Sequence, residues 1–318
     1  MKQMVAVVLP VFGLIAIGYA VAGLRLLRQE SGEALADFVF AVAIPLLIFR
    51  TLALADFSGA SPLLMWIPFF AVFAMNWMLG DVLIRRLFRR DARAGLVGGI
   101  SSAYGNTVLL GIPLTLAAYG GDGAVPMALI VAVHLPVMMV VSSVLIERAL
   151  RRDGVSEGHL DAKTRARNVL VTLVRSPIII GMLAGAAWRA FGLPFTGLPA
   201  VLAGRLADIA STLALFAMGM GLWRYGVRGN IRAGLLLSAL KLLVQPALVF
   251  LLVRTIAPMP ASWARVAVLA AACPTGVNAY LVAARFKTGE ALASNAISLS
   301  TALAVLTISF WIQMVGWL

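Results

Sequence analysis

Long apolar runs separated by short polar breaks dominate the chain. The runs recur from end to end at about the length needed to cross 30 Å of hydrocarbon as a helix. They predict ten spans, near residues 5–24, 35–54, 63–84, 95–118, 124–146, 168–190, 199–222, 232–256, 263–285 and 291–316. The longest polar segment, residues 147–167, divides these spans five and five. The pattern indicates an all-α polytopic membrane protein and lacks the short alternating strands of a membrane barrel.

Two of the apolar runs are interrupted by polar residues, glycine and proline. The sequence reads "NTVLLGIPL" at 106–114 and "CPTGVNAYL" at 273–281. Unpaired backbone in hydrocarbon is costly, so a broken helix persists only where it is buried in protein or lines a polar cavity. We expect Pro113 and Pro274 to cause the breaks, because proline removes a donor and clashes with the preceding turn. A broken helix also directs a positive half-helix N-terminus at the membrane middle, which favours an anion.

Composition agrees with a membrane protein and excludes several other classes. The chain is 62% hydrophobic and only 12% charged, whereas soluble domains carry roughly 25% charged residues. One cysteine excludes an intramolecular disulfide, and two distant histidines give no metal-ligand spacing. No phosphate-binding loop and no zinc-protease motif occur. We therefore expect no cofactor, no metal and no enzymatic activity.

The net charge of +13 is mainly a signal of membrane topology. Most of the 26 basic residues fall in the odd-numbered loops, including Arg85, Arg86, Arg89, Arg90 and Arg93 in the third and Arg148, Arg151, Arg152, Lys163, Arg165 and Arg167 in the fifth. Positive loops stay cytoplasmic, which predicts periplasmic termini, a cytoplasmic 147–167 loop and an inner-membrane location. The expected neighbours of this charge are anionic lipids, not nucleic acid.

The two halves of the chain carry weak echoes of each other. "LAD" occurs at 35–37 and 206–208, and "GD" at 121–122 matches "GE" at 289–290. The two interruptions are separated along the sequence by a similar number of residues. Because each half has an odd number of spans, a repeat places the halves in opposite orientations. We predict a first repeat over 1–146 and an inverted second repeat over 168–318. Inverted repeats with helix breaks at equivalent positions are typical of secondary transporters.

Several motifs resemble those of the auxin efflux carrier family. They are "FAVAIPLLIFRTLA" in span 2, "GNTVLLGIPL" in span 4, "KLLVQP" in span 8 and "CPTGVNAYLVAARF" in span 9. The resemblance covers essentially the whole chain. The 147–167 loop is shorter than the long regulatory loop of the plant carriers, and in this respect the chain resembles the bacterial permeases, some of which are linked to malonate. The resemblance therefore does not imply that this chain transports auxin, the substrate of the plant PIN-FORMED carriers.

The resemblance implies the ten-helix fold of bile-acid sodium symporters. Spans 4 and 9 would cross inside a moving core of spans 3–5 and 8–10, while spans 1, 2, 6 and 7 would form a scaffold that often dimerises. By matching motif positions, the residues at the crossover would be Asn106, Pro113, Pro274 and Asn278.

Polar residues near the interruptions are the candidates for substrate binding. They are Asn106, Thr107, Lys241, Cys273, Thr275 and Asn278. The amides and hydroxyls have a plainer interpretation as groups that satisfy freed backbone, and Cys273 as a small packing residue. Lys241 lies near mid-membrane, where a charge is costly and usually functional. It either attracts an anion or pairs with a neighbouring carbonyl, and the sequence leaves both open.

A second group of residues consists of candidates for ion or proton coupling. Asp208 lies inside span 7, and His134 in span 5 has a pKa suited to proton exchange. Gln245 follows Lys241 by one helical turn, and Ser298 belongs to a hydroxyl cluster in span 10 with Ser300 and Thr301. Packing is the plainer role for the histidine and the hydroxyls.

The leading functional prediction is a secondary carrier that moves a small organic anion, such as a dicarboxylate, by elevator-like alternating access. Coupling to H⁺ or Na⁺ stays open. The alternatives are a channel, which needs rings of like charge along a polar path, and an ion-coupled exporter of another amphipathic metabolite. A membrane enzyme is a third alternative, but the intramembrane acids are too sparse for a cluster of acids and histidines at one membrane face. The expected partners are a carboxylate substrate, the bilayer and a second copy of the chain.

Overall fold

The structure is a computed structural model that describes residues 2–55, 61–154, 162–227, 229, 231–255, 259–285 and 287–318. The described residues are helical apart from turns, short connections and one isolated bridge. In chain order the elements are α1 Lys2–Gly23, α2 Gln29–Phe38, η1 Val39–Ala43, α3 Ile44–Ala53, α4 Pro62–Leu87, α5 Ala92–Ala103, η2 Thr107–Gly111, α6 Ile112–Tyr119, α7 Gly121–Arg152, α8 Ala162–Val174, α9 Pro177–Ala190, α10 Gly197–Asp208, α11 Ala210–Tyr225, α12 Ile231–Ala239, η3 Leu240–Val244, α13 Gln245–Thr255, α14 Ala261–Ala272, α15 Asn278–Arg285, α16 Glu290–Met314 and η4 Val315–Trp317. The prediction of an all-α chain is confirmed for this part of the molecule.

Seven helical stretches in the described residues are long and apolar enough to cross a membrane. Three of the predicted spans correspond to shorter apolar helices, because each is interrupted. The span predicted near 95–118 is divided between α5 and α6, the span near 168–190 between α8 and α9, and the span near 263–285 between α14 and α15. The chain is thus a polytopic membrane protein.

Three short π-helical segments interrupt the α-helices, and each precedes a proline by two residues. The segments η1, η2 and η3 are followed by Pro45, Pro113 and Pro246 respectively. Proline cannot donate to the preceding turn, and its ring clashes with the carbonyl four residues back. A locally widened turn accommodates both effects without ending the helix, and such π segments often occur at functional sites.

Clustering of contacts divides the chain into two compact units. Unit 1 comprises Met1–Ala60, Val108–Pro136 and Leu160–Arg224, and unit 2 comprises Ser61–Thr107, Val137–His159 and Tyr225–Leu318. Each unit therefore takes segments from both halves of the sequence. The long helix α7 belongs to both, and the boundary falls directly after Pro136.

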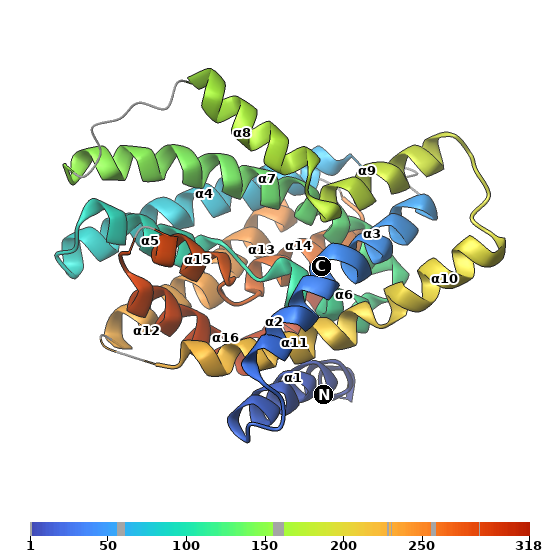
Figure 1. Cartoon of the computed structure of the whole chain (residues 1–318), viewed down its shortest axis with the longest axis horizontal. Helices are drawn as coiled ribbons and strands as arrows, with labels where there is room; N and C mark the ends of the chain where they lie inside the picture. The colour runs from blue at the N-terminus through green and yellow to red at the C-terminus, as the bar shows by residue number, and fades with distance from the viewer. Residues whose placement is uncertain are drawn as a thin grey trace. The chain divides into compact units, whose positions relative to one another are not determined.

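Within unit 1, α3 packs along α9 through glycine (Figure 1). A Cβ on Gly181 would lie 2.4 Å from the carbonyl oxygen of Pro45, and one on Gly185 would lie 2.6 Å from that of Phe49. The helix α11 approaches α1 in the same way, because a Cβ on Gly18 would lie 2.2 Å from the carbonyl oxygen of Phe216. Small residues that permit close backbone approach are typical of helix packing in membranes.

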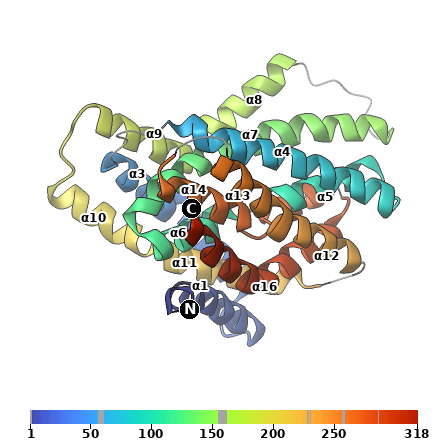
Figure 2. The same cartoon turned by 180° about the vertical axis from the view of Figure 1, so that it is seen from behind.

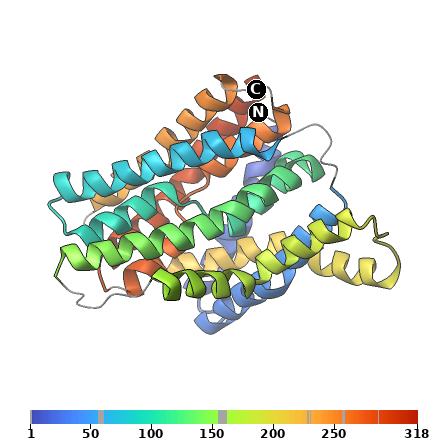
Figure 3. The same ribbon diagram turned by 90° about the horizontal axis from the view of Figure 1, so that it is seen from above.

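Unit 2 contains the close pair α4 and α5, drawn in cyan and teal in Figure 3. Glycine again permits the close approach of the two helices, since a Cβ on Gly80 of α4 would lie 2.1 Å from the hydroxyl oxygen of Ser102 in α5. In the same unit α12 packs on α16, and α13 packs on α14 and α4 (Figure 2). This packing holds both helices that end in the middle of the unit, α5 and α14.

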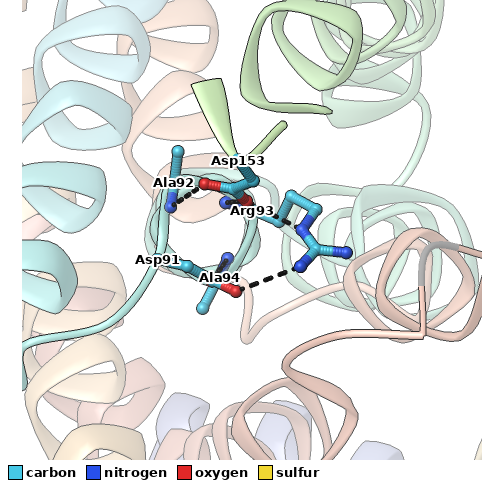
Figure 4. A network of polar contacts seen from close by, with 5 residues as sticks. All are labelled: Asp91, Ala92, Arg93, Ala94 and Asp153. Carbon is cyan, nitrogen blue, oxygen red and sulfur yellow. Dashed lines mark hydrogen bonds and ion pairs between the residues drawn. The ribbon is translucent and has the colours of Figure 1, made fainter. Parts of the chain in front are cut away.

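The N-terminus of α5 is tied to the end of α7 by Asp153 (Figure 4). The Asp153 carboxylate accepts hydrogen bonds from the backbone N–H groups of Ala92 and Arg93, both at 3.2 Å, and from Arg93 Nε at 2.7 Å. Asp91 caps the same helix by accepting from the N–H of Ala94 at 2.8 Å. Two carboxylates thus satisfy the free donors and the positive dipole end of α5.

Candidate functional site

The two interrupted helices of unit 2 meet at their breaks. The helix α5 ends at Ala103 and α14 ends at Ala272, and the chain continues in extended conformation through Tyr104 and Cys273. The N–H of Asn106 donates to the carbonyl of Pro274 at 2.8 Å. The N–H of Gly276 donates to the carbonyl of Tyr104 at 2.9 Å, which forms an antiparallel bridge. Each break thereby satisfies backbone groups that the other has freed.

Thr275 holds this crossing in place from its side chain and its backbone. Its hydroxyl donates to the carbonyl of Ser101 at 2.7 Å, and its N–H donates to the hydroxyl oxygen of Ser300 at 3.0 Å. Thr275 and Ser300 are fully buried. The crossing is therefore bonded to the last turn of α5 and to α16.

Lys241 is fully buried and reaches the same crossing from η3. Its ammonium donates to the carbonyl of Ala271, at the C-terminal end of α14, with Nζ and O 2.5 Å apart. A Cβ on Gly105 would lie 3.3 Å from Lys241 Nζ and 3.4 Å from Cys273 Cβ, so these groups border the bridge. A cation is favourable at a helix C-terminus. The pairing with a carbonyl, which the sequence left open, is present in the structure.

The remaining predicted substrate residues lie on the two sides of the bridge. The side chain of Asn278, the first residue of α15, hydrogen-bonds that of Tyr104. Asn106 and Thr107 are buried directly after the bridge, and the N–H of Thr107 donates to the carbonyl of Gly105 at 2.8 Å. Unit 2 thus brings all six predicted substrate residues into or next to the crossing.

Several buried polar atoms in unit 2 lack a hydrogen-bond partner among the residues that the structure describes. They include atoms of the side chains of Ser101, Thr107, Gln245 and Thr301. Gln245 leaves both its amide oxygen and its amide nitrogen unpaired and is 1% exposed. Buried polar groups are normally paired with protein or water. Unit 2 therefore has spare hydrogen-bonding capacity for a polar ligand or water.

Pro113 lies after the first break and not within it. The break lies at 104–106, whereas Pro113 is the second residue of α6 and follows η2. Proline is favourable in the first turn of a helix, where its missing N–H is not needed. The residue that faces Thr275 across the bridge is Gly105. Pro274, by contrast, lies within the second break.

The four candidates for ion or proton coupling are divided between the two units. Asp208 ends α10 in unit 1, where its carboxylate accepts from Arg50 Nη1 at 2.7 Å. His134 is buried in the part of α7 that belongs to unit 1. Gln245 and Ser298 lie in unit 2, and the Ser298 hydroxyl donates to the carbonyl of Gly226 at 2.9 Å.

Sequence reasoning missed Asn76, which is fully buried in α4. Its side-chain nitrogen donates to the carbonyl of Ser102 at 2.5 Å and to that of Leu240 at 3.3 Å. It therefore links α4 to the end of α5 and to the π segment that carries Lys241. An amide within an otherwise apolar span was the available signal. Tyr104 and Ser101 were missed as well, because their role at the crossing depends on which backbone groups meet.

Comparison with known proteins now identifies the family. A family model described as membrane transport protein matches residues 3–312. The chain belongs to this family, the auxin efflux carriers. A protein of Rhizobium meliloti named "Putative malonate transporter" is 30% identical, over 97% of this chain and 95% of its own length. An uncharacterized transporter of Methanothermobacter thermautotrophicus is 27% identical, over 96% of each chain. The chain is thus a multi-pass membrane transporter, and the resemblance noted in its motifs is confirmed.

No group of three or more histidine, cysteine, aspartate or glutamate side chains suited to a metal ion occurs in the described part of the chain. The chemistry that the site offers instead consists of one ammonium, several amides and hydroxyls, and the carbonyls of two helix ends. Such groups bind and orient a polar ligand.

Proposed function

We propose that the protein is a secondary carrier of a small organic anion, of the carboxylate class. The observation that carries this proposal is the buried ammonium of Lys241 at the crossing of two broken helices. An ammonium has three donors, and among the described residues its one hydrogen-bond partner is the carbonyl of Ala271. Donors remain for a carboxylate, and the positive charge near the middle of Ile231–Thr255 favours an anion over a cation.

The polar atoms without partners support a ligand of this kind. The amide of Gln245 and the hydroxyls of Thr107 and Thr301 are buried and unpaired in the described structure. A small dicarboxylate offers several acceptors to such donors, with Asn106 and Asn278 as further candidates. Malonate is the first compound to test, because a relative carries a malonate transporter's name.

The mechanism we propose is elevator-like alternating access by ten spans in two inverted repeats, over residues 1–146 and 168–318. Spans 3–5 and 8–10 would be the transport core and spans 1, 2, 6 and 7 the scaffold, which also forms a dimer. Support comes from the interleaved composition of the units and from the bridge between the two breaks, both in unit 2. Continuous helical backbone bonds are lacking at the breaks, as expected where a transporter binds its substrate.

The proposed location is the inner membrane, with both termini periplasmic and the 147–167 loop cytoplasmic. The loop charges support this orientation. Transport would be coupled to H⁺ or Na⁺, with Asp208, His134, Gln245 and Ser298 as the candidate residues. Uptake driven in turn by a proton gradient and by a sodium gradient distinguishes the two ions.

The test is counterflow of labelled malonate and other mono- and dicarboxylates in proteoliposomes, compared with labelled amines. We expect saturable exchange of a carboxylate and none of amines. Lys241→Met keeps the length of the side chain and removes its charge, so it should reduce exchange about ten-fold or more, as expected when a charged hydrogen bond is lost. Arg254→Met, which removes an exposed charge from the end of the same span, is the control. Preference for amines, or full activity of Lys241→Met, would contradict the proposal.

A further inference from the structure

Unit 2 contains a cavity of about 370 Å³ whose lining residues do not include Lys241. It is bordered by the end of α4 and by the first residues of α5, α12 and α16. Its apolar wall includes Ile84, Ala94 and Ala233, which belong to one buried cluster together with Leu240, the neighbour of Lys241. The cavity therefore adjoins, through that cluster, the segment that carries the buried ammonium.

The polar part of the wall comes from the α4–α5 loop and from the start of α16. Arg89 and Arg90 from the α4–α5 loop line it, together with Thr288 from the loop before α16 and Glu290, the first residue of α16. Both arginines are exposed and have no ion-pair partner among the described residues. A guanidinium presents donors in a planar fork that matches the oxygens of carboxylates and phosphates.

In the part of the chain that the structure describes, neither acidic residue of the wall forms an ion pair with these arginines. Asp91 also lines the cavity, but its carboxylate caps α5 through the N–H of Ala94 and pairs with Arg93 Nη2 at 3.4 Å. The nearby carboxylate of Asp153 is bonded to Arg93 and to the start of α5 (Figure 4). Glu290 is the second acid in the wall, so the lining residues carry two arginines and two carboxylates.

Two of the helices that begin at this cavity, α5 and α16, differ in how their N-termini are satisfied. The start of α5 has the carboxylates of Asp91 and Asp153. The start of α16 has Gly289 as its N-cap, without a side-chain cap, and residues 288–292 line the cavity. The first N–H groups of a helix have no partner within it. An anion at this position would satisfy both these donors and the arginines.

We propose that this cavity is a second anion site, which binds a phosphate group between Arg89, Arg90 and the first turn of α16. The phosphate belongs either to a free phosphate-type anion or to the headgroup of an anionic lipid. Basic pockets between membrane helices on the cytoplasmic side bind such headgroups, and an apolar wall beside a basic mouth suits an amphipathic ligand. The site is independent of the proposed carboxylate transport, since Lys241 does not line it.

The test uses the full-length protein purified in detergent and follows its thermal unfolding, because a ligand that binds the folded state raises the unfolding midpoint by mass action. The probes are inorganic phosphate and a short-chain phosphatidylglycerol, with a short-chain phosphatidylcholine as the uncharged comparison. Saturable stabilisation by phosphate indicates a site for free anions, and stabilisation by phosphatidylglycerol alone indicates a lipid site. Stabilisation by neither probe, or equally by phosphatidylcholine, would overturn the proposal.

Variants locate the site. The double variant Arg89→Gln/Arg90→Gln should need roughly ten-fold or more of the same probe for half-maximal stabilisation. Arg90→Gln alone should bind the probe several-fold more weakly. This variant leaves Arg89 unchanged, whose φ of 51° is in the left-handed region. Arg86→Gln removes an exposed charge from the end of α4 that does not line the cavity and should bind as the parent does. Glu290→Gln, which removes a negative charge from the wall, should bind the same probe more tightly than the parent does. Equal binding by the parent and Arg90→Gln would refute the assignment.

Discussion

The hydroxyl of Thr275 donates to the main-chain carbonyl of Ser101, which joins the ends of the two interrupted helices of unit 2. This carbonyl belongs to the last turn of α5, where carbonyl groups lack partners within the helix. The hydrogen bond therefore replaces one that a continuous helix would have made. The broken backbone is held by side chains of the opposite break, which fixes the geometry around Lys241.

Replacement of Thr275 by valine tests this link. Valine keeps the shape of the side chain but leaves the Ser101 carbonyl buried and unpaired, so Thr275→Val should lower the free energy of unfolding by about 1–3 kcal/mol. Thr115→Val is the control, because Thr115 is equally buried but bonds only carbonyls of its own helical turn. Thermal unfolding in detergent measures both. If the two variants unfold at the same temperature, the hydroxyl of Thr275 does not hold the crossing together.

Much of this arrangement could be predicted from the sequence, because the signals were local. A run of apolar residues specifies a span whatever its neighbours are. The amides and prolines within such runs, at Asn106, Pro274 and Asn278, indicated interruptions at the level where the structure places them. Lys241 was identified in the same way, as a charge that hydrocarbon does not tolerate without a partner.

The features that could not be predicted depend on contacts between distant segments. Gly105 is unremarkable in the sequence and becomes the crossing residue because the bridge brings Lys241 and Cys273 against it. The position of Pro113 relative to the break could not be predicted, because a proline in the first turn of a helix and a proline at a break look alike in one sequence. The division of α7 after Pro136 likewise follows from packing, not from local composition.

A methyl group at Gly105 should disturb the Lys241 ammonium directly. Its Cβ would lie 3.2 Å from Lys241 Cε and 3.3 Å from Nζ, closer than ordinary contact. Overpacking of this kind costs about 1–3 kcal/mol, and displacement of the ammonium should also reduce carboxylate counterflow. Gly221→Ala is the control, because a Cβ there meets nothing within 4 Å. A Gly105→Ala protein that exchanges substrate like Gly221→Ala would show that the crossing has room to spare.

The cap that Asp153 provides for α5 should be sensitive to the loss of its charge. Asp153→Asn leaves one acceptor oxygen where two now receive three hydrogen bonds, so we expect a loss of about 0.5–2 kcal/mol. Asp91→Asn is the matched control, since asparagine caps a helix about as well as aspartate. Hydrogen exchange of the amides of Ala92 and Arg93 reports the cap locally. Faster exchange in Asp91→Asn than in Asp153→Asn would reverse the assignment.

The close approach of α1 and α11 in unit 1 depends on a reciprocal pair of glycines. A Cβ on Gly18 would lie 2.2 Å from the carbonyl oxygen of Phe216, and one on Gly219 would lie 2.1 Å from that of Ile15. These neighbours are backbone atoms of packed helices, which cannot move aside as the end of a side chain can. Gly18→Ala should therefore force the helices apart and cost about 2–3 kcal/mol.

The same helix supplies the control for this substitution. A Cβ on Gly13 meets nothing within 4 Å, so Gly13→Ala should be neutral or stabilising by about 0.4–1 kcal/mol through the entropy of the unfolded chain. Because Gly18 and Gly219 belong to one interface, the double alanine variant should lose less than the sum of the single losses. Thermal unfolding of the parent, Gly13→Ala, the two single variants Gly18→Ala and Gly219→Ala, and the double variant provides the measurement. Strict additivity, or a Gly18→Ala protein as stable as Gly13→Ala, would mean that the two glycines do not set the distance between α1 and α11.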